Sequence, residues 1–586
     1  MFFPSRPSCP SRLSCLLCLV LLAACNRTPV STPQTTADWF TDRAEDAGLR
    51  FTHVNGMSGK FHYAEIIGSG AAMFDMDNDG DLDVFLVQYR GQSRLFRNDL
   101  VHGKLSFTDV TETSGIVTHD GGMGVAAGDF DNDGCIDLFL TYLGPNQLWR
   151  NNCDGTFTDV STQSGLVSPK LAGNQASEGG WSVSAAWIDY DRDGWLDLFV
   201  GNYLRWSEAT STPCHAASGR PDYCSPNVYQ PLPSRLYHNN HDGTFTDVTA
   251  RAGLSGEFGP ALGVSAADFN NDGWTDIYVA NDGQPNQLWI NRHDGTFVNT
   301  GLRSGAALSA SGKAKGSMGV DAGDVDNDGD EDLFMTELTG EGSNFFVNDG
   351  TAAFEERGVP SGLNRLTGAR TGFGTAWIDV DNDGWLDLWT VNGAVQAIEA
   401  LARVRDPFPL HQQMQLLRNT RNGRFEDAAD RAPRVFELSD VGRGAAFGDI
   451  DNDGDVDVVV NNNNGRARLL INNIGNQNHW IGLRLESSVG SVRLQADGRP
   501  AKAGRYKSRD ALGARVAVVL DNGMTLWRRA RSDGSYASAN DPRVVVGLGQ
   551  SAHPARVRVI WPDGSADTWN DLPIDRYTTL REGRVP

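Results

Sequence analysis

The sequence predicts an all-β protein in which a seven-bladed β-propeller is followed by a small β-sandwich-like domain. Glycine is unusually common, at 66 of 586 residues, and long amphipathic helical patterns are nearly absent. This composition favours short strands joined by tight turns. In addition, one Asp-rich motif recurs seven times and alternates with a second motif. Repetition of this kind is typical of propellers and other repeat architectures.

The recurring motif is Asp-x-Asp-x-Asp-Gly-x-x-Asp, and its chemistry suits a hard cation. Ca²⁺ takes about six to eight oxygen ligands, and side chains at positions 1, 3, 5 and 9 of a tight loop can converge on one ion. Glycine at position 6 allows the backbone to reverse around the ion. We expect up to seven structural Ca²⁺ ions rather than Asp-Gly turns without metal, and a weaker fourth site because Asn270 lacks a charge. The expected ligands, loop by loop, are Asp75, Asp77, Asp79 and Asp83; Asp129, Asp131, Asp133 and Asp137; Asp189, Asp191, Asp193 and Asp197; Asp268, Asn270, Asp272 and Asp276; Asp324, Asp326, Asp328 and Asp332; Asp379, Asp381, Asp383 and Asp387; and Asp449, Asp451, Asp453 and Asp457.

These loops differ from EF-hand loops, which carry a bidentate glutamate at position 12 and lie between helices. After each loop the sequence continues as a short β-like run, such as VFLV after Asp83 and IYVA after Asp276. We therefore predict loops that lie between strands. The residues at position 12 are Leu86, Leu140, Val200, Val279, Met335, Thr390 and Val460.

The second motif is Phe-Thr-Asp or a looser form of it, and several copies follow an Asp-Gly or Asn-Gly pair that is typical of a tight hairpin. The series begins with this motif at Phe40 and ends with the loop at Asp449 and a strand over residues 468–473. A ring in which the N-terminal strand completes the last blade would leave no free sheet edge. We therefore predict a closed propeller over residues 38–473 and a second domain over 474–586. The copies begin at Phe40, Phe107, Phe157, Phe245, Phe297, Phe354 and Phe425.

The N-terminus has the features of an exported lipoprotein. Arg6 and Arg12 precede an apolar run over residues 13–24 that is too short to span a bilayer as a mature helix. The run ends in Leu-Ala-Ala-Cys25, which resembles the bacterial lipobox, whose cysteine is acylated and becomes the first residue. We expect a signal peptide over residues 1–24, lipidation at Cys25 and a flexible tether over 25–37. The resemblance implies anchoring to the outer membrane or cell surface through the lipid alone, with an ordinary signal peptide as the alternative.

Four cysteines remain for the exported protein. An even number in an oxidising compartment favours disulfides, with free buried thiols as the alternative. Of the three possible pairings the two local ones are preferred, which join Cys214 to Cys224 and Cys135 to Cys153. No cysteine cluster has the spacing of zinc ligands.

The charge distribution separates an acidic body from a mildly basic C-terminal part. The formal net charge of −23 argues against a nucleic-acid partner. Residues 474–586 hold 17 Lys/Arg and 11 Asp/Glu, which is about +6 and leaves about −29 for the preceding residues. The basic cluster over residues 493–531 could dock an acidic glycan, an anionic surface or the acidic propeller, or could form a solvated face.

Catalytic motifs are not recognisable, because the sequence contains no G-x-S-x-G, P-loop or HExxH pattern. His53, His62 and Glu65 precede the first loop, and we expect them at the surface or at strand ends. We predict a binding, adhesion or interaction protein with a protein or glycan ligand at the cell surface, and no enzyme. A calcium-dependent polysaccharide-active enzyme and a structural or assembly factor of the cell envelope are the alternatives. The sequence specifies neither the ligand nor the oligomeric state.

Residues 39–473 resemble the FG-GAP/VCBS repeat family, whose integrin-like propellers carry calcium loops of this form. The resemblance implies calcium at the aspartates of the loops. From Asn478 onward, the stretches NHWIGLRLE, SRDALGARVAV, DGSYASANDPRVVVGLG and VRVIWPDG resemble the ASPIC/UnbV domain. Together the two parts resemble a bacterial member of the cartilage acidic protein-like family. For the C-terminal part, the resemblance implies a compact β domain and no biochemical role.

Overall fold

The computed structural model describes residues 38–166, 180–488, 508–553 and 556–584. The predicted signal peptide, tether and lipidation site lie outside these residues, as does part of the basic cluster. Strands dominate the described chain and its helices are single turns, so the prediction of an all-β propeller fold is confirmed. None of the described helices has the length and apolarity needed to cross a membrane.

Seven four-stranded antiparallel sheets lie between Phe40 and Asn472 in the described part of the chain. In the first six sheets the strands follow one another in sequence from the first strand to the fourth. The seventh takes its outer strand from the N-terminus, because β1 pairs with β34. The sheets are, in order, β2 (Ala71–Phe74), β3 (Asp83–Leu86), β4 (Arg94–Asn98) and β5 (Phe107–Asp109); β6 (Gly122–Gly128), β7 (Asp137–Tyr142), β8 (Gln147–Asn151) and β9 (Phe157–Asp159); β10 (Ser182–Ile188), β11 (Asp197–Asn202), β16 (Arg235–Asn239) and β17 (Phe245–Asp247); β18 (Ala261–Ala267), β19 (Asp276–Asn281), β20 (Gln287–Asn291) and β21 (Phe297–Asn299); β22 (Val320–Gly323), β23 (Asp332–Met335), β24 (Asn344–Asn348) and β25 (Phe354–Glu356); β26 (Gly372–Ile378), β27 (Asp387–Asn392), β29 (Gln415–Asn419) and β30 (Phe425–Asp427); and β32 (Gly442–Gly448), β33 (Asp457–Asn462), β34 (Arg468–Asn472) and β1 (Phe40–Asp42).

Neighbouring sheets pack face to face through apolar side chains. The first strand of each sheet contacts the first strand of the next, and β32 of the seventh sheet contacts β2 of the first. One apolar cluster fills each gap; for example, Met73 and Val84 of the first sheet pack with Val459 and Leu469 of the seventh. Burial on both faces explains why inner strands such as β2 and β6 are apolar or glycine-rich rather than alternating in polarity.

Short helices and two-stranded ladders connect the sheets. The helices are α1 (Ala44–Ala47), α2 (Thr111–Ser114), α3 (Ser161–Ser164), α4 (Gly301–Ser304), α5 (Leu363–Thr367), α6 (Glu399–Arg403) and α7 (Pro433–Phe436), with 3₁₀ turns η1 (Tyr63–Ile66), η2 (Glu208–Thr210), η3 (Pro226–Val228), η4 (Leu254–Gly256), η5 (Ala429–Arg431) and η6 (Gly475–Gln477). The ladders pair β12 (Leu204–Arg205) with β15 (Gln230–Pro231), β13 (Cys214–His215) with β14 (Pro221–Asp222), and β28 (Gln412–Gln413) with β31 (Ser439–Asp440).

Both predicted disulfides are present and stabilise local features. Cys135 pairs with Cys153, which joins the second loop to the following hairpin. Cys214 pairs with Cys224 and closes an insertion between β11 and β16.

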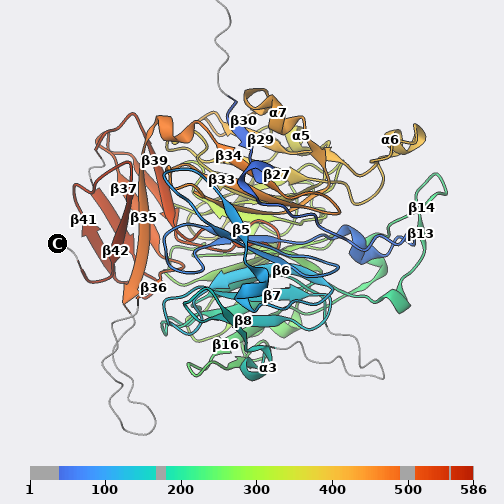
Figure 1. The fold of residues 1–586 in the computed structure, drawn as a ribbon, viewed down its shortest axis with the longest axis horizontal. Coiled ribbons are helices and arrows are strands. Elements are labelled where there is room, and N and C mark those ends of the chain that lie inside the picture. Colours follow the sequence, from blue (N-terminus) through green and yellow to red (C-terminus); the bar gives the residue numbers. More distant parts are fainter. Residues whose placement is uncertain (1–37, 167–179, 489–507, 554–555, 585–586) are drawn as a thin grey trace, which may run out of the picture. The chain divides into compact units, whose positions relative to one another are not determined.

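The C-terminal part forms two further four-stranded sheets that share one apolar core, in agreement with the predicted sandwich-like domain. Residues such as Ile481, Val516 and Trp561 fill this core. In Figure 1 these strands lie at the opposite side of the molecule from β13, β14 and α6. One sheet has the order β36 (Ser508–Asp510), β35 (His479–Ser488), β39 (Val544–Gly549), with β42 (Tyr577–Arg581) parallel to β35, and the other has the order β38 (Thr525–Arg529), β37 (Arg515–Val519), β40 (Arg556–Ile560), β41 (Ala566–Trp569).

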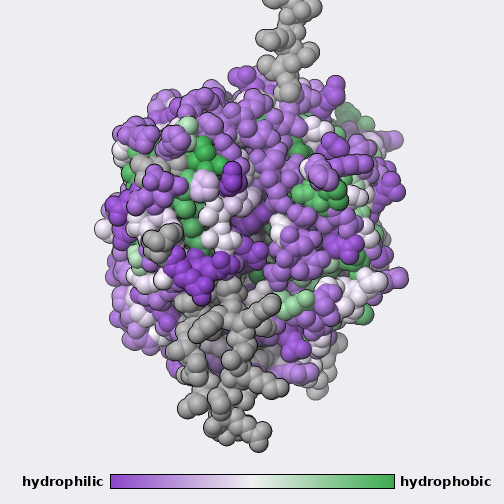
Figure 2. Space-filling view, turned by 60° about the vertical axis from the view of Figure 1, so that its left-hand side comes forward, coloured by the Kyte–Doolittle hydropathy of each residue, from purple (hydrophilic) through white to green (hydrophobic). Residues whose placement is uncertain are grey.

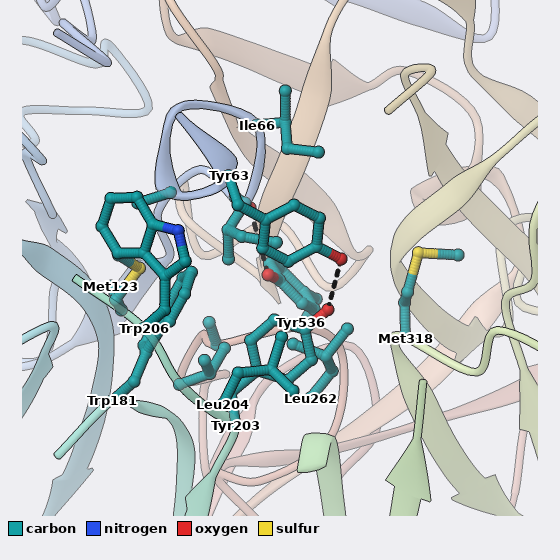
Figure 3. Close-up of a cluster of buried hydrophobic side chains, with 14 of the residues drawn as sticks. Tyr63, Ile66, Met123, Trp181, Tyr203, Leu204, Trp206, Leu262, Met318 and Tyr536 are labelled. Atoms are coloured by element: carbon teal, nitrogen blue, oxygen red, sulfur yellow. Dashed lines mark hydrogen bonds between the residues drawn. The ribbon is translucent and has the colours of Figure 1, made fainter. Parts of the chain in front are cut away.

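Residues 532–541 of the C-terminal part, here termed the plug segment, enter the centre of the seven sheets. Tyr536 is fully buried there; its ring packs edge-on against Phe373 and its hydroxyl donates to the Ile67 carbonyl oxygen at 3.0 Å. It belongs to a central cluster with Tyr63, Met123, Trp181, Tyr203, Leu262 and Met318 (Figure 3). The plug segment has a hydrogen bond to the inner strand of every sheet, through Ala71, Val125, Ser184, Ala266, Val320, Thr375 and Ala445.

Close packing around the plug segment explains the glycine that directly precedes β2. A Cβ atom at Gly70 would lie 1.7 Å from the Ala537 carbonyl oxygen, far inside contact distance. The position of this segment is not predictable from its sequence, because nothing in its composition indicates that it leaves its own domain.

Candidate metal loops

All seven Asp-rich loops share one backbone framework at the same end of the sheets, here termed the loop end. In the second loop, Asp129 Oδ1 accepts a hydrogen bond from the Asp133 N–H at 2.9 Å, and Asp129 Oδ2 accepts from the Gly134 N–H at 2.8 Å. The equivalent pairs in the other loops measure 2.8–3.2 Å. The glycines at position 6 all have φ between 84° and 101°, the left-handed region that glycine adopts readily, and the backbone reverses there as expected.

The aspartate at position 9 begins the second strand of each sheet and is almost completely buried. In the second sheet, Asp137 is 0% exposed, and its carboxylate accepts from the Phe130 N–H at 3.0 Å and the Asn151 N–H at 2.8 Å. Burial raises the pKa of Asp197 and Asp276 to about 8 and that of Asp137 well above its usual range, with neighbouring aspartates adding to the effect. These carboxylates therefore require protons or a cation close by.

The remaining loop aspartates divide into two kinds. Position 3 is directed inward: one carboxylate oxygen each of Asp77, Asp381 and Asp451 is buried and receives no hydrogen bond from any described residue. In the first loop, ligand atoms of Asp75, Asp77 and Asp83 lie within 4.8 Å of one another. Position 5 instead serves its own turn, because its Oδ1 accepts from the N–H of position 7 at 2.9–3.3 Å in all seven loops.

The donor set fits a hard cation, since buried and unpaired carboxylate oxygens are costly without a partner. The structure thus gathers positions 1, 3 and 9 in the first two loops, where Asp129, Asp131 and Asp137 form the second group. In the fourth loop, the Asn270 amide donates to Asp272 Oδ2 at 2.8 Å, so its nitrogen is turned toward a neighbouring carboxylate.

A ring of asparagines that the sequence motifs did not reveal joins each sheet to the loop of the preceding sheet. Asn151 ends the third strand of the second sheet; its side-chain Nδ2 donates to the Met76 carbonyl oxygen of the first loop at 2.8 Å. The equivalent bond occurs in every sheet at 2.8–3.1 Å, and Asn98 of the first sheet reaches Ile450 of the seventh loop. The signal was present as an asparagine at the end of each third strand. The seven residues are Asn98, Asn151, Asn239, Asn291, Asn348, Asn419 and Asn472.

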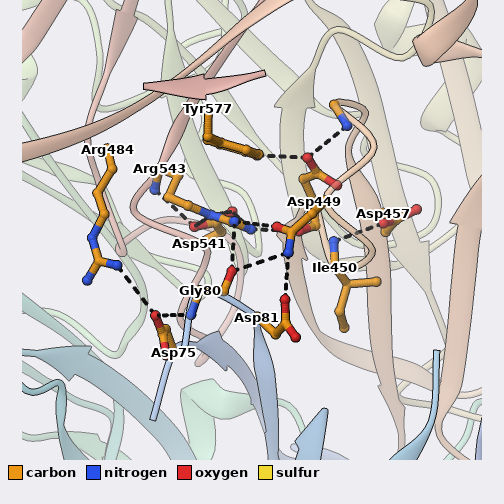
Figure 4. Close-up of polar contacts among 12 residues, drawn as sticks. Asp75, Gly80, Asp81, Asp449, Ile450, Asp457, Arg484, Asp541, Arg543 and Tyr577 are labelled. Atoms are coloured by element: carbon orange, nitrogen blue, oxygen red, sulfur yellow. Dashed lines mark hydrogen bonds and ion pairs between the residues drawn. The ribbon is translucent and has the colours of Figure 1, made fainter. Parts of the chain in front are cut away.

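Side chains of the C-terminal domain, among them two arginines, contact the first and seventh loops (Figure 4). Arg543 donates to the Asp449 carbonyl oxygen and to Asn452 Oδ1, both at 2.6 Å, and the Tyr577 hydroxyl donates to Asp449 Oδ2 at 2.8 Å. Arg484 lies 3.5 Å from Asp75 Oδ2. The basic side chains of this domain thus face the acidic loops.

Four arginines of the basic cluster take part in the same interface. Arg515 donates to Asn271 Oδ1 at 2.7 Å, and Arg531 forms an ion pair with the buried Asp321 of β22. Arg528 donates to the Gly384 carbonyl oxygen at 3.2 Å, and Arg529 lies 3.6 Å from Glu331. Of the roles considered for the cluster, docking onto the acidic propeller is the one that these described residues perform.

The opposite end of the sheets holds a cavity of about 410 Å³ beside the central cluster. The second strand of each sheet starts at an Asp-rich loop and ends at the opposite end of the sheet. The lining residue Asp282 directly follows the second strand β19, so the cavity lies at that opposite end. Tyr63, Leu262, Met318 and Phe373 form its apolar wall, and Asp282 and Glu399 supply carboxylates. Asp282 is 6% exposed and accepts a hydrogen bond from the Tyr203 hydroxyl at 2.5 Å, which in turn meets the Tyr63 hydroxyl at 2.7 Å.

The expectation that His53 and Glu65 lie at the surface or at strand ends is wrong, because both are buried, at 1% and 3% exposure, and neither belongs to a strand. The Asn464 N–H donates to His53 Nδ1 at 3.1 Å, so Nε2 carries the proton and donates to Ser69 Oγ at 3.0 Å. Burial lowers the pKa of His53 to about 3. Glu65 accepts from the Tyr223 hydroxyl at 3.1 Å. The segment before the first sheet folds inward at the opposite end, which the sequence pattern did not indicate.

The fold and loops define a β-propeller with Asp-rich loops and an appended β domain, and comparison with known proteins supports this class. The family model described as FG-GAP-like repeat matches residues 75–140, 129–200, 217–279, 268–335, 324–390 and 409–460, more than half of the chain. The chain belongs to this FG-GAP-like repeat family. A second model, described as ASPIC and UnbV, matches residues 504–586.

Cartilage acidic protein 1 of Homo sapiens is 24% identical over 516 residues, which cover 84% of this chain and 69% of that protein. The Xenopus tropicalis protein of the same name is 24% identical over 533 residues, covering 85% and 71%. The resemblances stated from the sequence are thus confirmed, and neither relative is described as an enzyme. The BP39L lectin from Burkholderia pseudomallei has a TM-score of 0.40 and 13% identity, with 70% of this chain and 96% of that chain covered.

Proposed function

We propose that the protein is an exported, lipid-anchored binding protein whose loops hold structural Ca²⁺ ions. The seven sheets would act as the blades of one ring, closed where β1 pairs with β34. The observation that carries the calcium proposal is the set of buried position 9 aspartates beside the unpaired oxygens of Asp77, Asp381 and Asp451. Bound Ca²⁺ would supply the positive charge that these carboxylates lack, and the C-terminal arginines supply part of it from outside.

Replacement of one buried ligand tests the calcium proposal. Asp137→Asn removes a charge from the second loop, whereas Asp154→Asn changes an exposed aspartate on the neighbouring hairpin. We expect the first variant to lose one Ca²⁺ per chain in elemental analysis and the second to keep the wild-type number. Equal calcium content in both variants, or none in the wild type, would contradict the proposal.

Export and anchoring rest on the N-terminal sequence, namely the apolar run and Cys25. We propose attachment to the outer membrane or cell surface through acylation of this residue. Metabolic labelling with an alkyne fatty acid should mark the wild type and leave Cys25→Ser unlabelled. Labelling that persists in the variant, or a wild type that is secreted without label, would refute the anchor.

For the partner, we propose a protein or glycan ligand that binds at the end opposite the loops. The C-terminal domain already contacts several loops at the loop end, whereas the opposite end carries the 410 Å³ cavity with its apolar wall and two carboxylates. The surface on the side of the C-terminal domain is mostly hydrophilic (Figure 2).

A binding screen of glycans and envelope proteins, with and without Ca²⁺, tests the location of this ligand site. Asp282→Asn should weaken any captured ligand, and Asp294→Asn, an exposed change on the loop side, should not. Turnover of a glycan in the same screen would instead favour the alternative of a polysaccharide-active enzyme. Capture that is indifferent to both substitutions would place the ligand elsewhere.

A further inference from the structure

The third loop differs from the other six in the side chains that surround it. Two histidines lie on either side of Asn239, the member of the asparagine ring in the third sheet. His238 lies one residue before Asn239, and His241 lies two residues after it. At the first position the other sheets carry arginine, isoleucine or valine. At the second position they carry Leu100, Cys153, His293, Gly350, Arg421 and Ile474.

Both imidazoles point at the aspartates of the loop. His238 Nδ1 lies 3.3 Å from Asp191 Oδ2 and 3.2 Å from Asp197 Oδ1. His241 Nε2 lies 2.5 Å from Asp193 Oδ2. Ligand atoms of Asp191, Asp197 and His238 lie within 4.8 Å of one another, and so do those of Asp193, His238 and His241.

The surrounding rings hold the imidazoles in these orientations. His241 stacks on Trp195, with ring centroids 4.8 Å apart and planes inclined by 18°. His238 meets the Tyr190 ring edge-on. The tryptophan occupies position 7 of the same loop, so the loop itself fixes the ring that faces its carboxylates.

This mixed donor set favours a different class of metal from the other loops. Ca²⁺ is hard and takes oxygen ligands, whereas imidazole nitrogen suits zinc and other first-row transition metals. Tetrahedral coordination with bonds of about 2.0–2.1 Å places neighbouring ligand atoms about 3.3–3.4 Å apart. The two distances from His238 to its aspartates are close to this value. We propose that the third loop binds a divalent first-row transition metal ion of the zinc class, through His238, His241 and its aspartates.

This inference rests on the proposal that the loops are cation sites, and its test separates the two. The full-length protein is saturated with Ca²⁺ and titrated with Co²⁺ as the probe, and the visible absorption of Co²⁺ and the bound calcium are both measured. The test variant carries His238→Asn and His241→Asn. The control is His293→Asn, which removes the single imidazole of the fourth loop.

We expect the wild type and the control to bind one Co²⁺ tightly while Ca²⁺ is present. The double variant should bind it at least about 100-fold more weakly, because losses outside the ligand shell alone cost 10–100-fold. Its unchanged calcium content would show that it is folded. Equal Co²⁺ binding by the double variant and the wild type, or no Co²⁺ binding by either, would overturn the inference. The two histidines would then only form ion pairs with the aspartates of the third loop. If Co²⁺ binding is equal or absent in this way but calcium is bound, the calcium proposal still stands. If Co²⁺ binding is equal or absent and no sample contains calcium, both proposals are refuted.

Discussion

Truncation of Tyr536 tests whether the plug segment holds the two parts of the protein together. Tyr536→Ala removes a fully buried ring from the central cluster, together with its hydrogen bond to Ile67. Removal of a buried aromatic side chain costs about 3–5 kcal/mol, and loss of one hydrogen bond adds about 1 kcal/mol. The free energy of unfolding should therefore fall by about 4–6 kcal/mol.

Equilibrium unfolding in urea, followed by tryptophan fluorescence, measures this loss against two controls. Tyr536→Phe keeps the ring and should cost about 1 kcal/mol. Phe408→Ala truncates an aromatic residue that is 57% exposed and should change stability by less than about 0.5 kcal/mol. If Tyr536→Ala were no more destabilising than Phe408→Ala, the plug segment would not occupy the centre of the sheets.

Three further predictions concern the Asp-rich loops, the ring of asparagines between neighbouring sheets, and the insertion closed by the disulfide between Cys214 and Cys224. Burial raises the pKa of Asp83 to about 8 in the calcium-free fold, so protonation stabilises that fold at low pH and this stability is lost as the pH rises toward 8. The increase in Tm on adding Ca²⁺ should therefore grow between pH 5 and pH 8. An increase in Tm that is the same at both pH values would contradict the electrostatic argument. Asn151→Ala leaves the buried Met76 carbonyl oxygen unpaired and should lower the free energy of unfolding in urea by about 1–3 kcal/mol. Asn152→Ala changes an exposed residue and should not lower it. Equal effects of the two substitutions would count against a stabilising role for the asparagine ring. Cys214→Ser with Cys224→Ser should weaken the insertion by about 2–3 kcal/mol and speed its proteolysis without altering calcium content, while unchanged proteolysis would show that the insertion does not depend on the disulfide.

Local sequence patterns predicted the elements that depend on neighbouring residues. The Asp-rich motif indicated strand-flanked loops because its spacing, its glycine and the apolar run after it are all local, and each second strand does start at position 9. The Phe motif likewise marked the outer strands, including β1. The disulfides between Cys135 and Cys153 and between Cys214 and Cys224 were accessible because both partners are close in sequence.

Features that depend on distant parts of the chain could not be predicted in the same way. From the sequence, Tyr536 could equally belong to the core of its own β domain. Only the assembled structure shows that it lies at the centre of the seven sheets. The burial of His53 and Glu65 depends on Ser69, Asn464 and Tyr223, which the topology brings together. The imidazoles of the third loop lie more than 40 residues after its aspartates, so the loop motif alone did not include them.

The central claim is that the Asp-rich loops hold cations in the folded protein. Equilibrium dialysis of the full-length protein against radioactive Ca²⁺ at pH 7.5, with saturating Zn²⁺ present, tests it most directly. We predict about six bound Ca²⁺ per chain, one for each loop except the third, and loss of this calcium to a chelator should lower the Tm. A chain that binds no calcium and keeps its Tm in the chelator would contradict the account.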